Sequence, residues 1–553
     1  MMNYFVKKML NLHSYKVRVP MLRRFTAVVC SVLLLSAGWL GIGGFYLLAA
    51  FIPLLWISDS YDSSRRSWFA VAGWALLAFV LWNAATVWWV WNATWVGPVA
   101  ATLASSSLNI TAFMLYHTFS KRSSRVLSYT VLVAAWIATE YWYTVGEFSF
   151  PWLILGNGFC EVPWAVQWYE YTGVFGGSLW VLLTNVLLYE AWRQRRRATA
   201  AAAVLSALLP LTLSAAMFCT YKTSDEGSLR VSVVQPDVDC YDKFSGDSAW
   251  QERNLMELLA ETPADADFIA MPETALTDYI FELSAAVVPV VDSISSLLRA
   301  RGSRATVVTG ASTWTMYSAA DRSATARYNK SAGYYYDLFN SALSITPAGK
   351  TDIYHKSRLV IGVEKMPMPK LFEWLSFLVI DLGGTVGQLG VGSEASVFMS
   401  DGGVAVGPAI CYEALYGDWY GGFVRKGARA MLVISNDGWW GDTPGYKRLF
   451  AFCRLRAVEH RRAIARSANT GISGFIDERG CDGQRMGWDE RGVLTDDITL
   501  NSRLTFYTRY GDYIGRAAEY LLLLCLLCMA AKFFRSLPLR KKSPSPEKRK
   551  RKK

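Results

Sequence analysis

The sequence predicts a bundle of membrane-spanning helices joined to a separate domain that mixes strands with helices. Three observations lead to this prediction. Of the 553 residues, 52% are hydrophobic and only 18% are charged, which is typical of a membrane protein with a soluble part. Long apolar runs fill the first 220 positions, and one more lies near the C-terminus. From about residue 228 to 505, charged residues return and short strand patterns alternate with helical ones, among them one long predicted helix over residues 446–466.

The apolar runs predict eight membrane spans. The first run, residues 25–57, is too long for one ordinary span, and its glycines at 38, 41, 43 and 44 supply a turn. We therefore expect a hairpin of two short helices there. The other six predicted spans are residues 68–91, 99–119, 126–145, 168–188, 200–219 and 517–534.

The charges of the links between these spans alternate. Arg65 and Arg66, residues 121–125 and residues 193–197 are basic, whereas residues 92–98 carry no Lys or Arg. Basic links favour the cytoplasmic side of a membrane. With eight spans, all the basic links lie in the cytoplasm and the α/β domain lies on the outer face of the membrane.

The chain then divides into five parts. They are a basic cytoplasmic N-terminus (1–24), a seven-span region (25–220), an α/β domain (225–512), an eighth span (513–534) and a basic cytoplasmic tail (535–553). The tail holds much of the net charge of +12, and beside a span such charge indicates orientation or lipid contact. We therefore expect a bilayer, and no nucleic acid, as a partner.

Glu140 lies inside the fifth predicted span, where a carboxylate is costly. Two interpretations stay open, a structural polar contact and a role in lipid access. No metal or cofactor is expected, because the four histidines are scattered and the nine cysteines show no zinc spacing or disulfide framework. Whether Cys240 and Cys481 pair also stays open.

Three reactive side chains follow strand patterns in the α/β domain: Glu273, Lys356 and Cys411. A cysteine nucleophile needs a base and a group that stabilises the oxyanion, and Glu and Lys supply both. The domain has only two histidines, His355 and His460. Taken singly, the three side chains also fit a helix-capping carboxylate, a surface lysine and a small core residue. Their shared position at strand ends indicates an active site.

Several motifs resemble the nitrilase superfamily. They are Met-Pro-Glu-Thr at 271–274, the segment around Lys356, Pro-Ala-Ile-Cys-Tyr-Glu at 408–413 and Ser-Asn-Asp-Gly-Trp-Trp-Gly at 435–441. With the spans around the domain, the whole chain resembles the apolipoprotein N-acyltransferase family. The resemblance implies a four-layer αββα sandwich and a triad, with Glu273 as general base, Lys356 as oxyanion stabiliser and Cys411 as nucleophile.

The resemblance also implies a multi-pass protein of the bacterial inner membrane, with its catalytic domain on the periplasmic face, and a two-step reaction. Cys411 would take an acyl chain from a membrane phospholipid as a thioester. The free N-terminal amine of the diacylglyceryl-cysteine of an apolipoprotein would then take that chain as an amide, the last step of lipoprotein maturation. Two other functions stay open, a membrane-tethered nitrilase-type amidase that acts on small amides and a transporter with an outer domain.

Four further residues have expected roles by the same resemblance. Glu364 matches a second carboxylate of the family and is expected to orient Lys356 or relay protons, although Ile-Gly-Val at 361–363 departs from the usual Pro-Phe-Gly. Glu413 is expected to support the site. Tyr412 and Trp439 are expected to line it and bind substrate, and ordinary packing around the nucleophile is the alternative for both.

Overall fold

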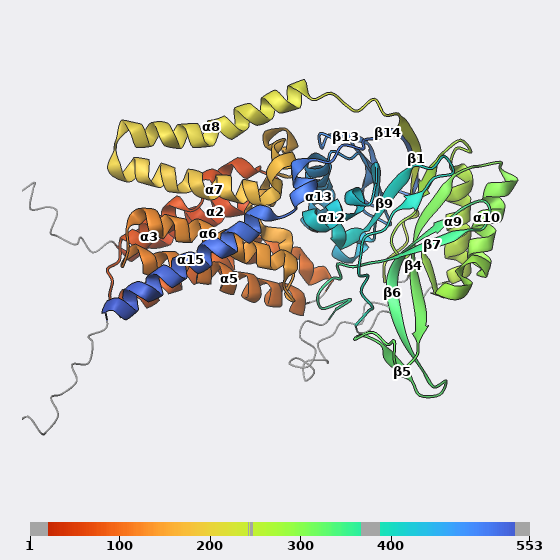
Figure 1. Cartoon of the computed structure of the whole chain (residues 1–553), viewed down its shortest axis with the longest axis horizontal. Helices are drawn as coiled ribbons and strands as arrows, with labels where there is room; N and C mark the ends of the chain where they lie inside the picture. The colour runs from red at the N-terminus through yellow and green to blue at the C-terminus, as the bar shows by residue number, and fades with distance from the viewer. Residues whose placement is uncertain (1–19, 94, 242, 244–246, 366–387, 537–553) are drawn as a thin grey trace, which may run out of the picture.

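The computed structural model describes residues 20–93, 95–241, 243, 247–365 and 388–536. The predicted basic termini, 1–24 and 535–553, lie almost entirely outside the described residues. Figure 1 shows a bundle of helices at one end of the molecule and an α/β domain at the other, as the sequence predicts.

Every predicted span lies on helical structure. The helices of the bundle are α2 (Met21–Ala37), η2 (Gly44–Ala49), α3 (Ile52–Asp59), α4 (Arg65–Val87), η3 (Trp88–Asn92), α5 (Val96–Ser120), α6 (Arg125–Val145), α7 (Tyr169–Gln194), α8 (Arg197–Thr220) and α15 (Tyr513–Ser536). Among the described residues, five helices are long and apolar enough to cross a membrane. These are Arg65–Asn92, Val96–Ser120, Tyr169–Gln194, Arg197–Thr220 and Tyr513–Arg535. The chain therefore has several apolar helices, and the count of eight spans stays a prediction.

The first apolar run does turn back on itself. Helix α2 ends at Ala37, and the chain passes through Gly41 (φ 82°) and Gly43 (φ 118°) before η2 and α3. Positive φ angles of this kind favour glycine. The glycines thus make the turn that the sequence predicts.

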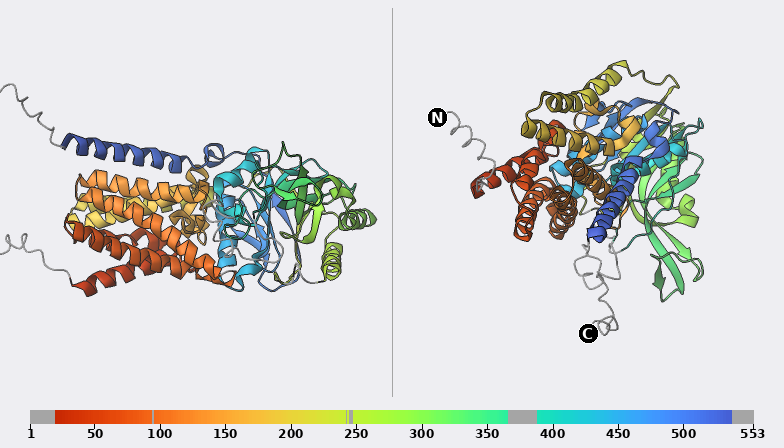
Figure 2. Two further views of the ribbon diagram at one scale, coloured as in Figure 1. Left: turned by 90° about the horizontal axis from the view of Figure 1, so that it is seen from below. Right: turned by 60° about the vertical axis from the view of Figure 1, so that its left-hand side comes forward.

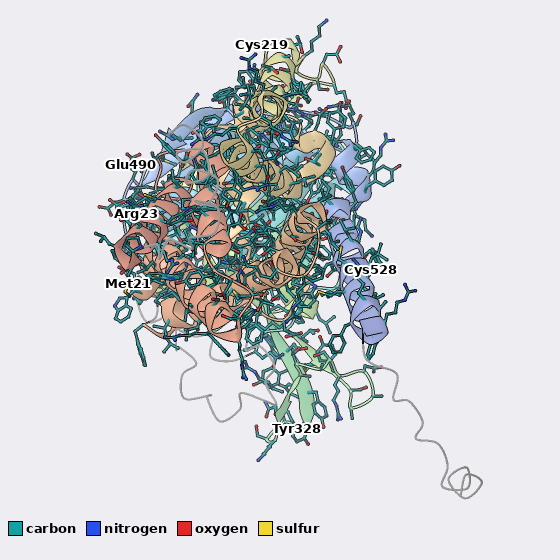
Figure 3. All side chains as sticks on the ribbon, turned by 90° about the vertical axis from the view of Figure 1, so that its left-hand side faces the viewer. Met21, Arg23, Cys219, Tyr328, Glu490 and Cys528 are labelled. Carbon is teal, nitrogen blue, oxygen red and sulfur yellow. The ribbon has the colours of Figure 1, made fainter. Side chains whose placement is uncertain are left out.

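The edges of the bundle are formed by α8 and α15. Helix α8 packs on α7, and α15 packs on α6 (Figure 2). Both helices are mostly exposed. Figure 3 shows Cys219 at the end of α8 and Cys528 on α15, both at the periphery of the bundle. Apolar helices with so much exposed surface fit contact with lipid tails.

The connection between α6 and α7, largely buried from Pro151 to Val166, lies at the junction of the bundle and the α/β domain. It contains three short helices, η4 (Pro151–Leu153), η5 (Leu155–Phe159) and η6 (Pro163–Val166). Glu140 accepts hydrogen bonds from the Leu155 backbone N–H (2.8 Å) and from the Trp136 indole (3.0 Å). These contacts favour the structural interpretation of Glu140.

The α/β domain contains two sheets packed face to face, with β1 next to β11 and β6 next to β9. The first sheet holds β1 (Ser228–Gln235), β2 (Phe268–Ala270), β3 (Leu276–Phe281), β4 (Thr306–Tyr317), β5 (Arg327–Asn329), β6 (Tyr334–Ile345), β7 (Thr351–His355) and β14 (Gly492–Thr499). The second holds β8 (Phe398–Met399), β9 (Ala405–Ile410), β10 (Ala430–Ser435), β11 (Ile464–Ala468), β12 (Ser473–Ile476) and β13 (Asp482–Met486).

Helices cover the outer face of each sheet and complete a nitrilase-like αββα sandwich. Helices α9 (Ser248–Glu261) and α10 (Pro289–Ala300) cover the first sheet, and α12 (Gly417–Arg425) and α13 (Pro444–His460) cover the second. The remaining short helices are η7 (Glu282–Val287), η9 (Cys411–Leu415), η10 (Asp437–Trp440) and α14 (Phe506–Tyr510). Because α13 also packs on α7, the second sheet lies on the bundle side of the domain (Figure 1).

One predicted boundary is wrong. The sequence predicts a single helix over residues 446–466, but α13 ends at His460 and residues 464–468 form the buried strand β11. Arg461 ends the helix in the left-handed conformation, with φ 50°. Its guanidinium is fully buried and donates hydrogen bonds to Gln167 and to the carbonyl of Glu478. These long-range contacts hold a conformation that usually requires glycine.

Candidate active site

Cys411 stands where strand β9 ends and helix η9 begins. Its φ is 48°, a left-handed value that is unusual for a residue other than glycine. Only 6% of its surface is exposed. Such strained conformations cluster at functional sites, where the surrounding structure holds them in place. The structure thus presents a buried thiol on a sharp turn, as the strand pattern of the sequence predicts.

Lys356 follows strand β7 and lies between two carboxylates. Its Nζ atom is 2.8 Å from Oε1 of Glu273 and 3.0 Å from Oε1 of Glu364. The amide of Asn340, on β6, donates to the same two oxygens at 2.7 Å each. The side chains of Lys356, Glu273 and Glu364 are 1%, 8% and 9% exposed. Two predicted residues and a predicted supporting carboxylate therefore form one buried network.

The charges of this network decide its protonation. Burial alone would raise the pKa of Glu273, but the charge of Lys356 and hydrogen bonds from Lys356, Asn340 and the Cys411 thiol outweigh it and lower that pKa. Burial would lower the pKa of Lys356, but Glu273 and Glu364 raise it well above its ordinary value. Burial, and then the charge of Glu273, raise the pKa of Cys411. The resting site thus holds an ionised carboxylate, an ammonium and a neutral thiol.

Glu413 connects the turns that carry the lysine and the cysteine. Its carboxylate accepts hydrogen bonds from the backbone N–H of Ser357 (2.8 Å), from the backbone N–H of Ile410 (2.8 Å) and from the hydroxyl of Tyr354 (2.6 Å). It is fully buried. Glu413 thereby joins Ser357, which follows Lys356, to Ile410, which precedes Cys411. Its supporting role in the reaction stays a prediction.

Three further residues hold Glu273 in place, and sequence reasoning assigned no role to them. The backbone N–H of Asn436 donates to Oε2 of Glu273 at 3.0 Å. The buried ammonium of Lys243 donates to the backbone carbonyl of Glu273 at 2.9 Å. Asn340 is the third, through its amide. Asn340 lies on β6 and Asn436 directly follows β10, so both are far from Glu273 in the sequence. Their contacts with Glu273 become evident only when the strands are assembled into sheets.

A cavity of about 90 Å³ opens onto these groups, and we call it the Cys411 cavity. It is lined by the network residues and by apolar side chains that include Leu338, Phe339, Val360, Val363 and Leu389. Trp439 and Trp440 form another part of its lining, together with Ala93, the residue that follows η3 of the bundle. The arrangement can therefore present a buried nucleophile to an apolar group that enters beside the bundle.

The two residues predicted to bind substrate lie in different places. Trp439 lines the Cys411 cavity. Tyr412 lies outside the lining that the described residues form, and its ring is packed near Trp152 and Tyr416. Its hydroxyl donates to the carbonyl of Ser149 at 3.1 Å. Tyr412 thus contacts the connection between α6 and α7, which fits the packing alternative, and its predicted substrate contact stays a prediction.

Comparison with known proteins finds a matching family model for each of the two parts of the chain. Residues 230–504 match the model of the carbon-nitrogen hydrolase family, and residues 31–187 match the apolipoprotein N-acyltransferase N-terminal domain. A protein of Chlorobaculum tepidum named apolipoprotein N-acyltransferase is 30% identical over 486 residues, which cover 84% of this chain and 88% of that protein. A protein of the same name from Allorhizobium ampelinum is 29% identical over 497 residues, or 83% and 87% of the two chains.

The matched segments follow the architecture. The first runs from α2 to α7, and the second spans the αββα sandwich with Glu273, Lys356 and Cys411 inside it. The similarity to the Chlorobaculum tepidum protein extends across both. With its helical bundle, its sandwich and 30% identity over most of its length, this chain belongs to the apolipoprotein N-acyltransferase family.

Proposed function

We propose that this protein transfers an acyl chain from a membrane phospholipid to the free N-terminal amine of the diacylglyceryl-cysteine of apolipoproteins. The observation that carries the proposal is the burial of the Cys411 thiol, the Glu273 carboxylate and the Lys356 ammonium at one cavity beside the helical bundle. The names of the relatives support the acceptor, and the apolar helices support a multi-pass protein of the bacterial inner membrane.

The first step forms a thioester. The sulfur of Cys411 attacks the ester carbonyl of the phospholipid while its proton passes to Glu273. Two N–H bonds of Lys356 are directed at carboxylates among the described residues, and its third donor serves the oxyanion. The C–O bond then breaks, Glu273 returns the proton to the leaving oxygen, and a lysophospholipid departs. Glu273 is the base of this step because its ionised carboxylate accepts a hydrogen bond from the Cys411 thiol.

The second step forms the amide. The acceptor amine attacks the thioester carbonyl and gives a proton to Glu273. The C–S bond breaks, and Glu273 protonates the departing sulfur, so the thiol is restored. One covalent intermediate thus divides a difficult acyl transfer into two easier steps.

The orientation of the α/β domain is part of the proposal. The alternating charges of the links between the spans favour the outer face of the membrane for this domain. Ala93, at the bundle end of the Cys411 cavity, lies in the link for which the outer side is predicted. Both substrates are anchored by lipid, so a cavity at this depth shares their plane.

Mass spectrometry tests the proposal. Purified protein incubated with phospholipid vesicles alone is expected to carry an acyl adduct on Cys411, and added diacylglyceryl lipopeptide is expected to remove that adduct and gain its acyl chain. Cys411→Ala is expected to do neither. Full transfer by Cys411→Ala, or transfer by the natural protein without any adduct, would overturn the mechanism. Hydrolysis of small amides without lipid transfer would favour the amidase.

A further inference from the structure

A second cavity, of about 400 Å³, shares a wall with the Cys411 cavity. We call it the Trp488 cavity. The side chain of Trp439 lines both cavities. Of two neighbouring residues in the chain, Asn92 lines the Trp488 cavity and Ala93 lines the Cys411 cavity. Trp439 therefore stands at the boundary between the two cavities.

The wall between the bundle and the α/β domain is fixed by hydrogen bonds at this point. The hydroxyl of Tyr241 donates to the backbone carbonyl of Asn92 at 2.9 Å, and the amide of Asn92 donates to the carbonyl of Trp440 at 2.8 Å. The rings of Tyr241 and Trp439 meet edge to face, with centroids 5.4 Å apart. The Trp488 cavity is thus a built feature of the junction between the two parts of the chain.

The linings of the two cavities differ in chemistry. The Cys411 cavity combines the charged network with aliphatic side chains such as Leu338 and Val360, which suit an acyl chain. The Trp488 cavity offers aromatic faces from Tyr241 and Trp488 together with polar groups from Asp239, Thr470 and Asn92. Its volume lies in the range of about 300–1,000 Å³ that is usual for ligand sites.

We propose that the Trp488 cavity binds the first residues of the acceptor polypeptide, those that follow its lipidated cysteine. This inference rests on the proposed function. In the second step the amine of that cysteine must reach Cys411, while its carbonyl carries the rest of the polypeptide. Consecutive Cα atoms are only about 3.8 Å apart, so the next residue starts directly beside the reaction centre. Amide groups buried there without hydrogen bonds would be costly, and the Trp488 cavity supplies partners for them.

The charge of the Trp488 cavity adds a preference to this binding. Asp239 is in its lining, and Asp489 directly follows Trp488 of the same lining in the chain. Asp239 is the one charged side chain that the described residues contribute to this lining, and it is acidic. A basic residue after the lipidated cysteine is expected to bind better than an acidic one.

The test compares two diacylglyceryl lipopeptides that carry either Lys-Lys or Asp-Asp after the cysteine. With the natural protein we expect a KM about threefold lower for the Lys-Lys peptide, the size of one partly exposed charge interaction. Asp239→Asn retains the capacity to accept the hydrogen bond that the Tyr241 backbone N–H donates to Asp239 at 2.8 Å, and is expected to remove the preference. Trp488→Ala is expected to raise KM about tenfold for both peptides, as loss of an aromatic contact does.

Acylation of Cys411 by phospholipid alone separates this inference from the proposed function. Both variants are expected to form the adduct as fast as the natural protein, because the Trp488 cavity acts only in the second step. Tyr328→Ala is the control, since Tyr328 is exposed on β5 at the edge of the domain (Figure 3). This variant is expected to change neither the KM for the lipopeptides nor the rate of adduct formation. Normal adducts with unchanged KM and preference in both variants would overturn the inference. Absence of the adduct in the natural protein would count against the proposed function instead.

Discussion

Glu459 of α13 accepts a hydrogen bond from the backbone N–H of Val174 in α7, at 3.0 Å. Val174 follows Gly173, where α7 is kinked with φ 60° and ψ −170°. The same carboxylate pairs with Arg456 at 2.9 Å, and Arg456 donates to the carbonyl of Leu415 at 3.2 Å. Leu415 is the last residue of η9, the helix that begins with the nucleophile. A continuous chain of contacts therefore links the kink of a bundle helix to the turn that carries the thiol.

Gly173→Ala tests this junction. A Cβ atom at Gly173 would lie 2.4 Å from the ring of Tyr507, and the left-handed backbone there is strained for any other residue. We expect the free energy of unfolding to fall by more than about 1 kcal/mol, with slower acylation of Cys411. Thermal unfolding of the detergent-purified protein measures the first effect.

Gly73→Ala is the matched control for that variant. Gly73 lies within helix α4, and an added Cβ atom there would meet nothing within 4 Å. Alanine in a helix interior is favoured over glycine by about 0.5–1 kcal/mol, so this variant is expected to be as stable as the natural protein or more so. Equal melting temperatures for the two variants would contradict the role of the kink.

Lys356→Met tests the cation of the site. The substitution leaves Glu273 and Glu364 buried without the ammonium that contacts both. We expect the rate of Cys411 acylation to fall by at least about a hundredfold, the usual loss when an oxyanion donor is removed. Lys350→Met, at a side chain that is 73% exposed, is expected to leave the rate unchanged. Acylation by Lys356→Met at a near-natural rate would exclude Lys356 from the chemistry.

Much of this site could be predicted from sequence, because each reactive group follows an apolar strand pattern. Glu273, Lys356 and Cys411 come together because β2, β7 and β9 end at the same cavity. The partners of these groups could not be predicted in the same way. Asn340 and Lys243 act through contacts between segments that are far apart in sequence, and neither residue follows a strand end.

For the fold, too, some features can be predicted from the sequence and others cannot. The bundle and the αββα sandwich follow from hydrophobic patterns, but the end of α13 does not. No Gly or Pro stands between the helix and residues 464–468, so the sequence gives no signal that the helix ends. The residue that ends it in the left-handed conformation is Arg461. What ends the helix is the set of partners that the Arg461 guanidinium finds in Gln167 and Glu478. Such contacts exist only once the fold has formed.

Glu413→Gln tests the connection between the two turns. The carboxylate accepts three hydrogen bonds, and an amide would direct its NH₂ group at donors such as the Ser357 and Ile410 N–H groups. A buried donor left without a partner costs about 1–3 kcal/mol, so we expect lower stability and slower acylation of Cys411. Glu394→Gln, at an exposed pair with Lys426, is the control and is expected to change neither. Unaltered melting of Glu413→Gln would contradict this role.

Lys243 makes the stability of the folded protein depend on pH. Burial lowers its pKa to about 8, against the attraction of Glu273, from an ordinary value of 10.5. Between these two values the unfolded chain binds a proton that the folded protein does not, so the contribution of Lys243 to stability rises with pH, by about 1.4 kcal/mol per unit. Below pH 8 both states hold the proton, and this dependence vanishes. Lys243→Gln is expected to lose the rise, so the melting temperature of the natural protein should gain on that of the variant between pH 8 and 10. Parallel melting curves for the two proteins over that range would show that Lys243 does not titrate in the folded state.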